Sequence, residues 1–140
     1  MSQSLSQSRF TPWAITALRI ITGLLFIEHG LVKLAGFPAG AQPGVQPLTS
    51  LFGVGGVIEL VTGLLVVVGL FARPAAFVAA GQMAVAYFMF HAPSGFYPVL
   101  NGGEPAILFA FIFLLLSTTG AGAFSLDGLR LARRPLAAAA

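Results

Sequence analysis

Long apolar runs, separated by short segments rich in glycine and proline, dominate the pattern of this chain. A helix needs roughly 17 to 25 residues to cross a bilayer. Four runs approach that length, and they predict spans at about 13–36, 51–72, 74–91 and 104–121. Helices are the economical structure for such spans, because every backbone N–H and C=O group inside a bilayer needs an internal partner. The pattern therefore predicts an all-α membrane protein folded as a four-transmembrane-helix bundle.

The segments outside these runs predict the topology. Residues 1–12 form a polar N-terminal tail, residues 13–127 the transmembrane domain, and residues 128–140 a basic tail with disorder expected after Pro135. The first run is too long for a signal peptide and lacks a convincing cleavage site. Arginines stand before the first run, between the second and third, and after the fourth: Arg9, Arg73, Arg130, Arg133 and Arg134. The other two connections contain no Lys or Arg, so we expect both termini to be cytoplasmic.

Composition narrows the class of protein further. Of the 140 residues, 57% are hydrophobic and 8% charged, and the mean hydropathy is +0.94. About 25% of the residues of an ordinary soluble domain are charged. The chain has no cysteine, which excludes disulfides, thiolate metal ligands and haem attachment through cysteine. The net charge of +3 comes from bases near span ends, so we expect a bilayer rather than a nucleic acid as the partner.

Ionisable residues interrupt the apolar runs, most densely in "FIEHGLVKL", residues 26–34. A helix rises about 1.5 Å per residue, which places Glu28 roughly 12 Å below the outer boundary of the bilayer. The same rise places Glu59 and Gln82 at about 13 Å. An isolated carboxylate at that depth costs several kcal/mol, so it should face the bundle, pair with a base or stay protonated. We therefore predict a polar layer that joins three helices.

A shallower polar set lies within about a turn and a half of the outer boundary. Its members are Lys33, His91, Asn101 and Glu104. The inner half offers only Arg19, which we expect to snorkel toward the headgroups. Together the two sets predict a polar pocket that opens outward and is closed below by apolar packing. Either Lys33 or His29 can neutralise Glu59 or Glu104, and the sequence leaves this pairing open.

Several structural interpretations stand beside the functional ones. Glu59 and Gln82 can serve only as interhelical hydrogen-bond partners, Lys33 as an interfacial anchor, and Glu104 as a helix start. The phenylalanines of the last two predicted spans either serve packing or line the path of a flat ligand. His29, His91 and Glu59 are the one conceivable metal set, but two histidines without a spacing motif do not predict a metal site.

The first predicted helix contains a conflict. Glu28 points nearly opposite a stripe made of Arg19, Gly23, Phe26, Gly30 and Lys33. If Glu28 faces the bundle, the glycine stripe faces lipid or a second protomer. A homo-oligomer is therefore expected.

Three segments carry a family resemblance: "LRIITGLLFIEHGLVKLAGF", "GGVIELVTGLLVVVGLFARPAA" and "NGGEPAILFAFIFLLLSTTGAGAFSLD". In order and spacing they resemble the DoxX family of small four-helix bacterial membrane proteins, over residues 18–127. The matching positions are Arg19, Gly23, Gly30, Lys33, Glu59, Gly63, Arg73, His91, Asn101, Gly102, Glu104 and Ser125-Leu126-Asp127. The resemblance implies a multi-pass protein of the bacterial inner membrane with redox associations, because relatives include a subunit of a thiosulfate:quinone oxidoreductase. Similar four-helix proteins act as assembly factors or cargo receptors.

The pocket and the resemblance together give the leading hypothesis, an accessory subunit that binds a quinone-like molecule or a lipid headgroup. Glu59, Glu28 and His29 would exchange protons. Ligand binding would involve Lys33, Gln82, His91, Asn101, Glu104 and Arg19. The chain has no metal-ligand cluster or flavin motif, so the only cofactor expected is a bound quinone, and electron transfer would need a redox-protein partner. The alternative is a non-enzymatic assembly or scaffold protein whose polar layer fixes helix packing.

Overall fold

The computed structural model describes residues 8–133, which are helical apart from connecting loops. The helices are α1 (Thr11–Ala35), α2 (Leu51–Val68), α3 (Ala72–Ala86), α4 (Pro98–Asn101), α5 (Glu104–Thr119) and α6 (Leu126–Ala132). The third helix continues through a π-helical turn, η1 (Tyr87–His91), and a 3-10 turn, η2 (Ala92–Ser94). Three helical stretches are long and apolar enough to cross a membrane: Thr11–Ala35, Leu51–Val68 and Ala72–Ser94. The apolar helix α5 is shorter.

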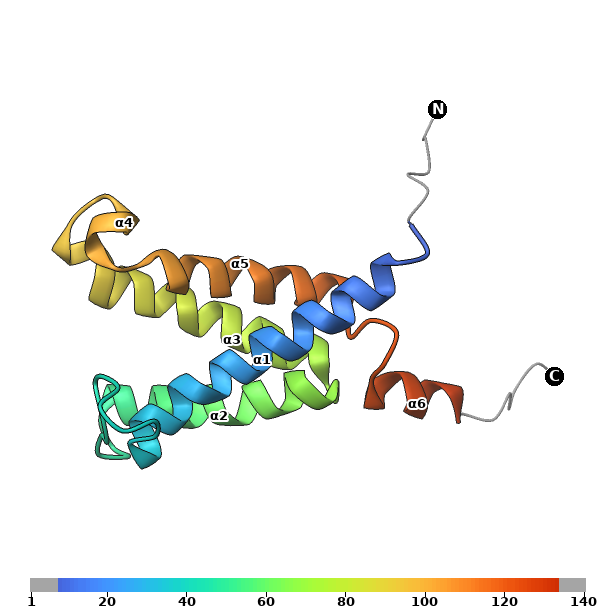
Figure 1. Ribbon diagram of the computed structural model, residues 1–140, viewed down its shortest axis with the longest axis horizontal. Helices are drawn as coiled ribbons and strands as arrows, with labels where there is room; N and C mark the ends of the chain where they lie inside the picture. The colour runs from blue at the N-terminus through green and yellow to red at the C-terminus, as the bar shows by residue number, and fades with distance from the viewer. Residues whose placement is uncertain (1–7, 134–140) are drawn as a thin grey trace.

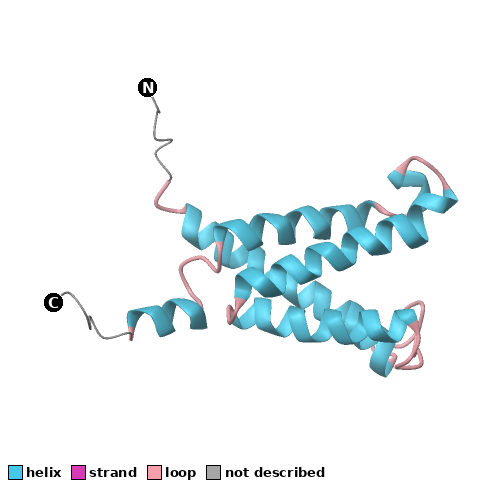
Figure 2. Cartoon of the chain, turned by 180° about the vertical axis from the view of Figure 1, so that it is seen from behind, coloured by secondary structure: helices cyan, strands magenta, loops and turns pink. Residues whose placement is uncertain are grey.

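The helices pack as two pairs, α1 with α2 and α3 with α5 (Figure 1). A short turn joins α2 to α3 at the end of the bundle where α1 begins and α6 lies; we call this the turn end. The connections 36–50 and 92–103 both lie at the opposite end of the bundle, the loop end (Figure 2). The two ends therefore differ in charge, because the bases Arg9, Arg73, Arg130 and Arg133 all belong to segments at the turn end.

Glycines set the distance between α1 and α2. A Cβ atom added to Gly30 would lie 2.9 Å from the carbonyl oxygen of Gly56 and 2.9 Å from the backbone nitrogen of Leu60. A Cβ atom on Gly63 would lie 3.2 Å from the carbonyl oxygen of Gly23. These neighbours are backbone atoms, which cannot move aside as a side chain can. The two helices therefore approach so closely that only glycine fits at their contact.

This contact resolves the conflict in the first helix. The stripe containing Gly23, Phe26 and Gly30 is buried inside the bundle, whereas Glu28 is exposed on the far side of α1. The prediction that Glu28 shares a polar layer with Glu59 and Gln82 was therefore wrong. Helical spacing correctly placed Glu28 opposite the glycine stripe, but close packing turned the stripe, not the carboxylate, toward α2.

The apolar core fills the space between the two helix pairs. Phe26 of α1 and Phe113 of α5 are fully buried, and their ring centroids lie 4.7 Å apart. Alanines of α3 complete the core at Ala75, Ala76, Ala79 and Ala80. Small side chains on α3 keep its axis close to its neighbours, and the phenylalanines supply the volume.

Arg19 is buried at the turn end, with 2% of its surface exposed. Its guanidinium group donates hydrogen bonds to the carbonyl oxygens of Val66, Val67, Ala121 and Phe124. The last carbonyls of a helix have no partner within the helix and carry partial negative charge. Arg19 supplies that partner at the end of α2, so the prediction that it snorkels to the headgroups was wrong.

The segment after α5 closes the same end. The carboxylate of Asp127 accepts hydrogen bonds from the backbone nitrogens of Phe71 and Ala72, each at 3.0 Å, and so caps the start of α3. The helix α6 begins at Leu126 and continues to Ala132, so it extends into the segment 128–140 that was predicted as a basic tail. The stretch beyond Pro135 and the first seven residues lie outside the described residues.

A pair of glycine substitutions tests the packing of α1 on α2. We expect Gly30→Ala to destabilise the fold by about 1 to 3 kcal/mol, because the methyl group meets backbone atoms and must push the helices apart. The control is Gly81→Ala on α3, where a Cβ atom meets nothing within 4 Å. Since alanine is the better helix former, that variant should gain about 0.5 to 1 kcal/mol. Thermal unfolding in detergent measures both, and equal unfolding temperatures would contradict the packing described.

Candidate functional site

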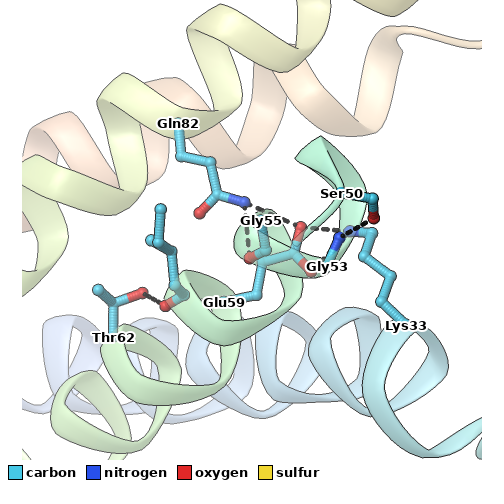
Figure 3. A network of polar contacts seen from close by, with 8 residues as sticks. Lys33, Ser50, Gly53, Gly55, Glu59, Thr62 and Gln82 are labelled. Carbon is cyan, nitrogen blue, oxygen red and sulfur yellow. Dashed lines mark hydrogen bonds and ion pairs between the residues drawn. The ribbon is translucent and has the colours of Figure 1, made fainter. Parts of the chain in front are cut away.

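An ion pair between α1 and α2 lies inside the loop-end half of the bundle (Figure 3). The Nζ atom of Lys33 is 2.5 Å from Oε1 and 2.6 Å from Oε2 of Glu59. The side chain of Glu59 is 2% exposed and that of Lys33 is 13% exposed. The pairing that the sequence left open is therefore Lys33 with Glu59, and the interpretation of Lys33 as a mere interfacial anchor does not hold.

Gln82 extends the ion pair to a third helix. Its Nε2 atom donates to Oε1 of Glu59 at 3.2 Å and to the carbonyl oxygen of Gly55 at 3.0 Å. Both partners are acceptors, so the nitrogen of the amide must face them and the oxygen must point away. That oxygen, Oε1, is buried and has no hydrogen-bond partner among residues 8–133. The network joins α1, α2 and α3 and leaves one acceptor for a further donor.

Local sequence explains why these side chains meet. Lys33 lies in the last turn of α1, where a positive charge is favoured by the helix dipole. Gly56 lies directly beneath it, and a Cβ atom there would be 2.9 Å from Cβ of Lys33. The stem of Lys33 therefore crosses the surface of α2 over a glycine and reaches Glu59, which lies about one turn further along α2.

A cavity of about 640 Å³ adjoins the network, between α1, α2, α3 and α5 at the loop end. Its polar lining comes from His29, Lys33, Glu59, Gln82 and His91. The remainder is mainly apolar and includes the aromatic rings of Phe52, Phe90 and Phe109. Small-molecule sites commonly have this composition, an apolar wall with a few polar groups at one place.

Aromatic rings form two walls of the cavity. The imidazole of His29 meets the ring of Phe109 edge-on, with centroids 5.7 Å apart and planes at 88°. The rings of Phe52, on α2, and Phe90, on η1, form the second wall, with their centroids 4.6 Å apart. A flat apolar group can contact both walls while its polar end reaches the Lys33–Glu59 pair.

The other candidate residues do not line the cavity. Asn101 is engaged in the loop, where its Nδ2 donates to the carbonyl oxygen of Gly95 at 2.7 Å and its Oδ1 accepts from the backbone of Gly103 at 2.8 Å. Glu28 and Glu104 are exposed and do not line the cavity. Arg19 lies at the turn end. Of the nine candidates, five come together: His29, Lys33, Glu59, Gln82 and His91.

The sequence predicted neither Phe52 as a residue of the cavity wall nor a metal centre. Phe52 carried no signal, because an aromatic residue near a span end is equally typical of the membrane interface. Within residues 8–133, no three His, Asp or Glu side chains gather as metal ligands would. His29, His91 and Glu59 share a cavity but do not form such a group.

Comparison with known proteins places the chain in a family. The DoxX family model matches residues 14–92, which is more than half of the chain. The chain belongs to the DoxX family. A protein of Haemophilus influenzae, described only as uncharacterized, is 41% identical over 123 residues, covering 85% of this chain and 92% of its own length.

A second relative is described as an uncharacterized membrane protein of Mycobacterium tuberculosis. It is 30% identical over 147 residues, covering 92% of this chain and 88% of its own length. No solved structure gives a significant match. Membership of the DoxX family, the apolar helices and this relative together identify a membrane protein.

A double-mutant cycle tests the ion pair. Lys33→Met and Glu59→Leu should each destabilise the protein by about 3 to 5 kcal/mol, because each leaves a charged group without its partner inside the bundle. The double variant should be more stable than either single variant, since no unpaired charge remains. Glu28→Gln is the control and should change stability by less than about 0.5 kcal/mol, because Glu28 is exposed. Strictly additive losses in thermal unfolding would show that the two side chains do not interact.

Proposed function

We propose that this DoxX family protein is an accessory subunit of a membrane redox system and binds a quinone-like molecule or a lipid headgroup in the loop-end cavity. The observation that carries the proposal is the cavity itself, about 640 Å³ of mainly apolar lining with the Lys33–Glu59 pair and Gln82 at one place. A molecule with a flat apolar body and a polar end matches that lining. Gln82 Oε1 supports an occupant that carries a hydroxyl group, because this buried acceptor has no donor among residues 8–133.

The proposal assigns roles to the residues of the cavity. Lys33 and Glu59 orient the polar end of the occupant, and Glu59 exchanges a proton with it. His29 and His91 are the other titratable groups of the lining, and they relay protons toward the loop end. Glu28 has no part in this scheme because it lies outside the cavity. Electrons would pass to or from a redox-protein partner.

The proposed topology has four membrane-crossing helices and cytoplasmic termini in a bacterial inner membrane. At about 1.5 Å per residue, α5 is roughly 24 Å long, slightly less than the hydrocarbon core of about 30 Å. Its packing along α3 supports a crossing through the same thickness (Figure 1). The arginines of the turn end support the cytoplasmic assignment. The cavity then opens to the outside.

A scaffold function is the second candidate. It is favoured by the same network, because hydrogen bonds from Lys33 and Gln82 to one carboxylate tie three helices together. In that case Glu59 fixes helix packing and the loop end docks a partner. The two candidates differ in whether the empty volume beside the network matters.

Filling the cavity separates the candidates. Ala86→Trp places a bulky ring in the cavity lining without removing any member of the ion pair. We expect mass spectrometry to find a stoichiometric quinone or a specific lipid with the wild type, and to find it lost from Ala86→Trp. Folded Glu59→Gln should also lose it, because the amide keeps hydrogen bonding but cannot hold the charge of Lys33.

Ala84→Trp is the matched control, since Ala84 is exposed on the same helix and does not line this cavity. It should retain the ligand. Ligand retained in Ala86→Trp, or no specific ligand in the wild type, would contradict the binding function and favour the scaffold.

A further inference from the structure

The loop-end cavity also reaches the side of the bundle, between α2 and α3. Three valines line the cavity and are at the same time exposed on the outer surface: Val54 of α2 is 46% exposed, and Val78 and Val85 of α3 are 49% and 53% exposed. A side chain that lines a cavity and is half exposed lies at the edge of an opening. We call the gap between Val54 on one helix and Val78 and Val85 on the other the side opening.

The polar network lies directly behind the side opening. Gln82 follows Val78 by four positions and precedes Val85 by three, so the three side chains share one face of α3. From this face the amide of Gln82 donates to Glu59 and to the carbonyl oxygen of Gly55 on α2 (Figure 3). A molecule that enters between the two helices therefore meets the network first.

The side opening faces lipid. Val78 and Val85 lie in the central part of Ala72–Ser94, one of the stretches long and apolar enough to cross a membrane. The ends of a crossing stretch reach the two membrane surfaces, so its central part lies in hydrocarbon. An opening at this place admits apolar chains from the bilayer. It would also bring those chains against the polar network, whose hydrogen-bonding groups gain nothing from hydrocarbon.

We propose that the occupant of the cavity is an amphiphile dissolved in the bilayer, with its polar end at the Lys33–Glu59 pair and its apolar chain in the side opening. This inference rests on the binding function proposed above and names the class of ligand, a polar head that carries a long apolar chain. A quinone with an isoprenoid chain and a lipid with an acyl chain share this chemistry. The polar head supplies hydrogen bonds to the network, and the chain stays in contact with lipid and with the exposed valines.

Matched tryptophan substitutions test where the chain lies. Val54→Trp narrows the side opening from α2, and Val85→Trp narrows it independently from α3. Val57→Trp is the control, because Val57 is also a valine of α2, is 42% exposed and does not line the cavity. The probes are decylubiquinone and oleoyl-lysophosphatidylglycerol, which represent the quinone and the lipid source. Native mass spectrometry of the protein in detergent measures their apparent affinities, and comparing variants with one probe cancels its partition into micelles.

We expect one of the two probes to bind the wild type, and that probe identifies the source of the ligand. It should bind Val54→Trp and Val85→Trp at least tenfold more weakly, because its chain loses apolar contacts in the side opening. The Val57→Trp control should stay within twofold of the wild type. The same ring or headgroup without its chain should bind the wild type and Val54→Trp equally, because the substitution lies away from the polar end.

Two results would overturn the position of the chain while leaving the binding function intact. One is equal affinity of the chain-bearing probe for Val54→Trp, Val85→Trp and Val57→Trp. The other is an equal loss of chain-bearing and chain-free probes, because the tryptophan would then have filled the cavity and not the opening. If neither chain-bearing probe binds the wild type, the binding function itself fails and this inference fails with it. Thermal unfolding confirms that each variant is folded.

Discussion

The close approach of α1 and α2 is the constraint on which the rest of the structure depends. Glycines at the contact bring backbone against backbone, and a single methyl group at Gly30 would already meet main-chain atoms. This contact fixes how α1 is rotated about its axis. Once the rotation is fixed, Lys33 at one end of α1 reaches Glu59, and Arg19 nearer the other end reaches the last carbonyls of α2. Two charged residues therefore reinforce one helix pair from inside.

The two charged groups have different consequences. Arg19 donates only to backbone carbonyls, joining α2 to the segment after α5, and it completes helix-end hydrogen bonding where water is excluded. Lys33 meets a carboxylate beside a cavity. All four hydrogen bonds of Arg19 go to backbone carbonyl oxygens, whereas the Lys33–Glu59 pair places polar side-chain atoms next to open volume. This difference is why the loop end, not the turn end, is the place to look for a ligand.

Part of the site could be predicted from the sequence. Depth along the helices correctly indicated that Glu59 and Gln82 lie at one level, and the cost of an unpaired carboxylate indicated that Glu59 needs a partner. The choice of Lys33 over His29, and the exclusion of Asn101 and Glu104 from the cavity, could not be predicted. Those outcomes depend on loop geometry and on side-chain direction, for which helical periodicity gives no information.

The sequence by itself determined the helices, because apolar runs of spanning length with no polar alternative for their backbone groups leave no other structure. It also determined the relative angles of residues on each helix, including the opposition of Glu28 to the glycine stripe. Only the tertiary structure decided which of those two faces turns inward. In a soluble protein the apolar face would turn inward, but lipid and protein interior are both apolar, so the hydrophobic pattern cannot distinguish them. Steric fit between the helix backbones at the glycines turns the glycine stripe of α1 inward.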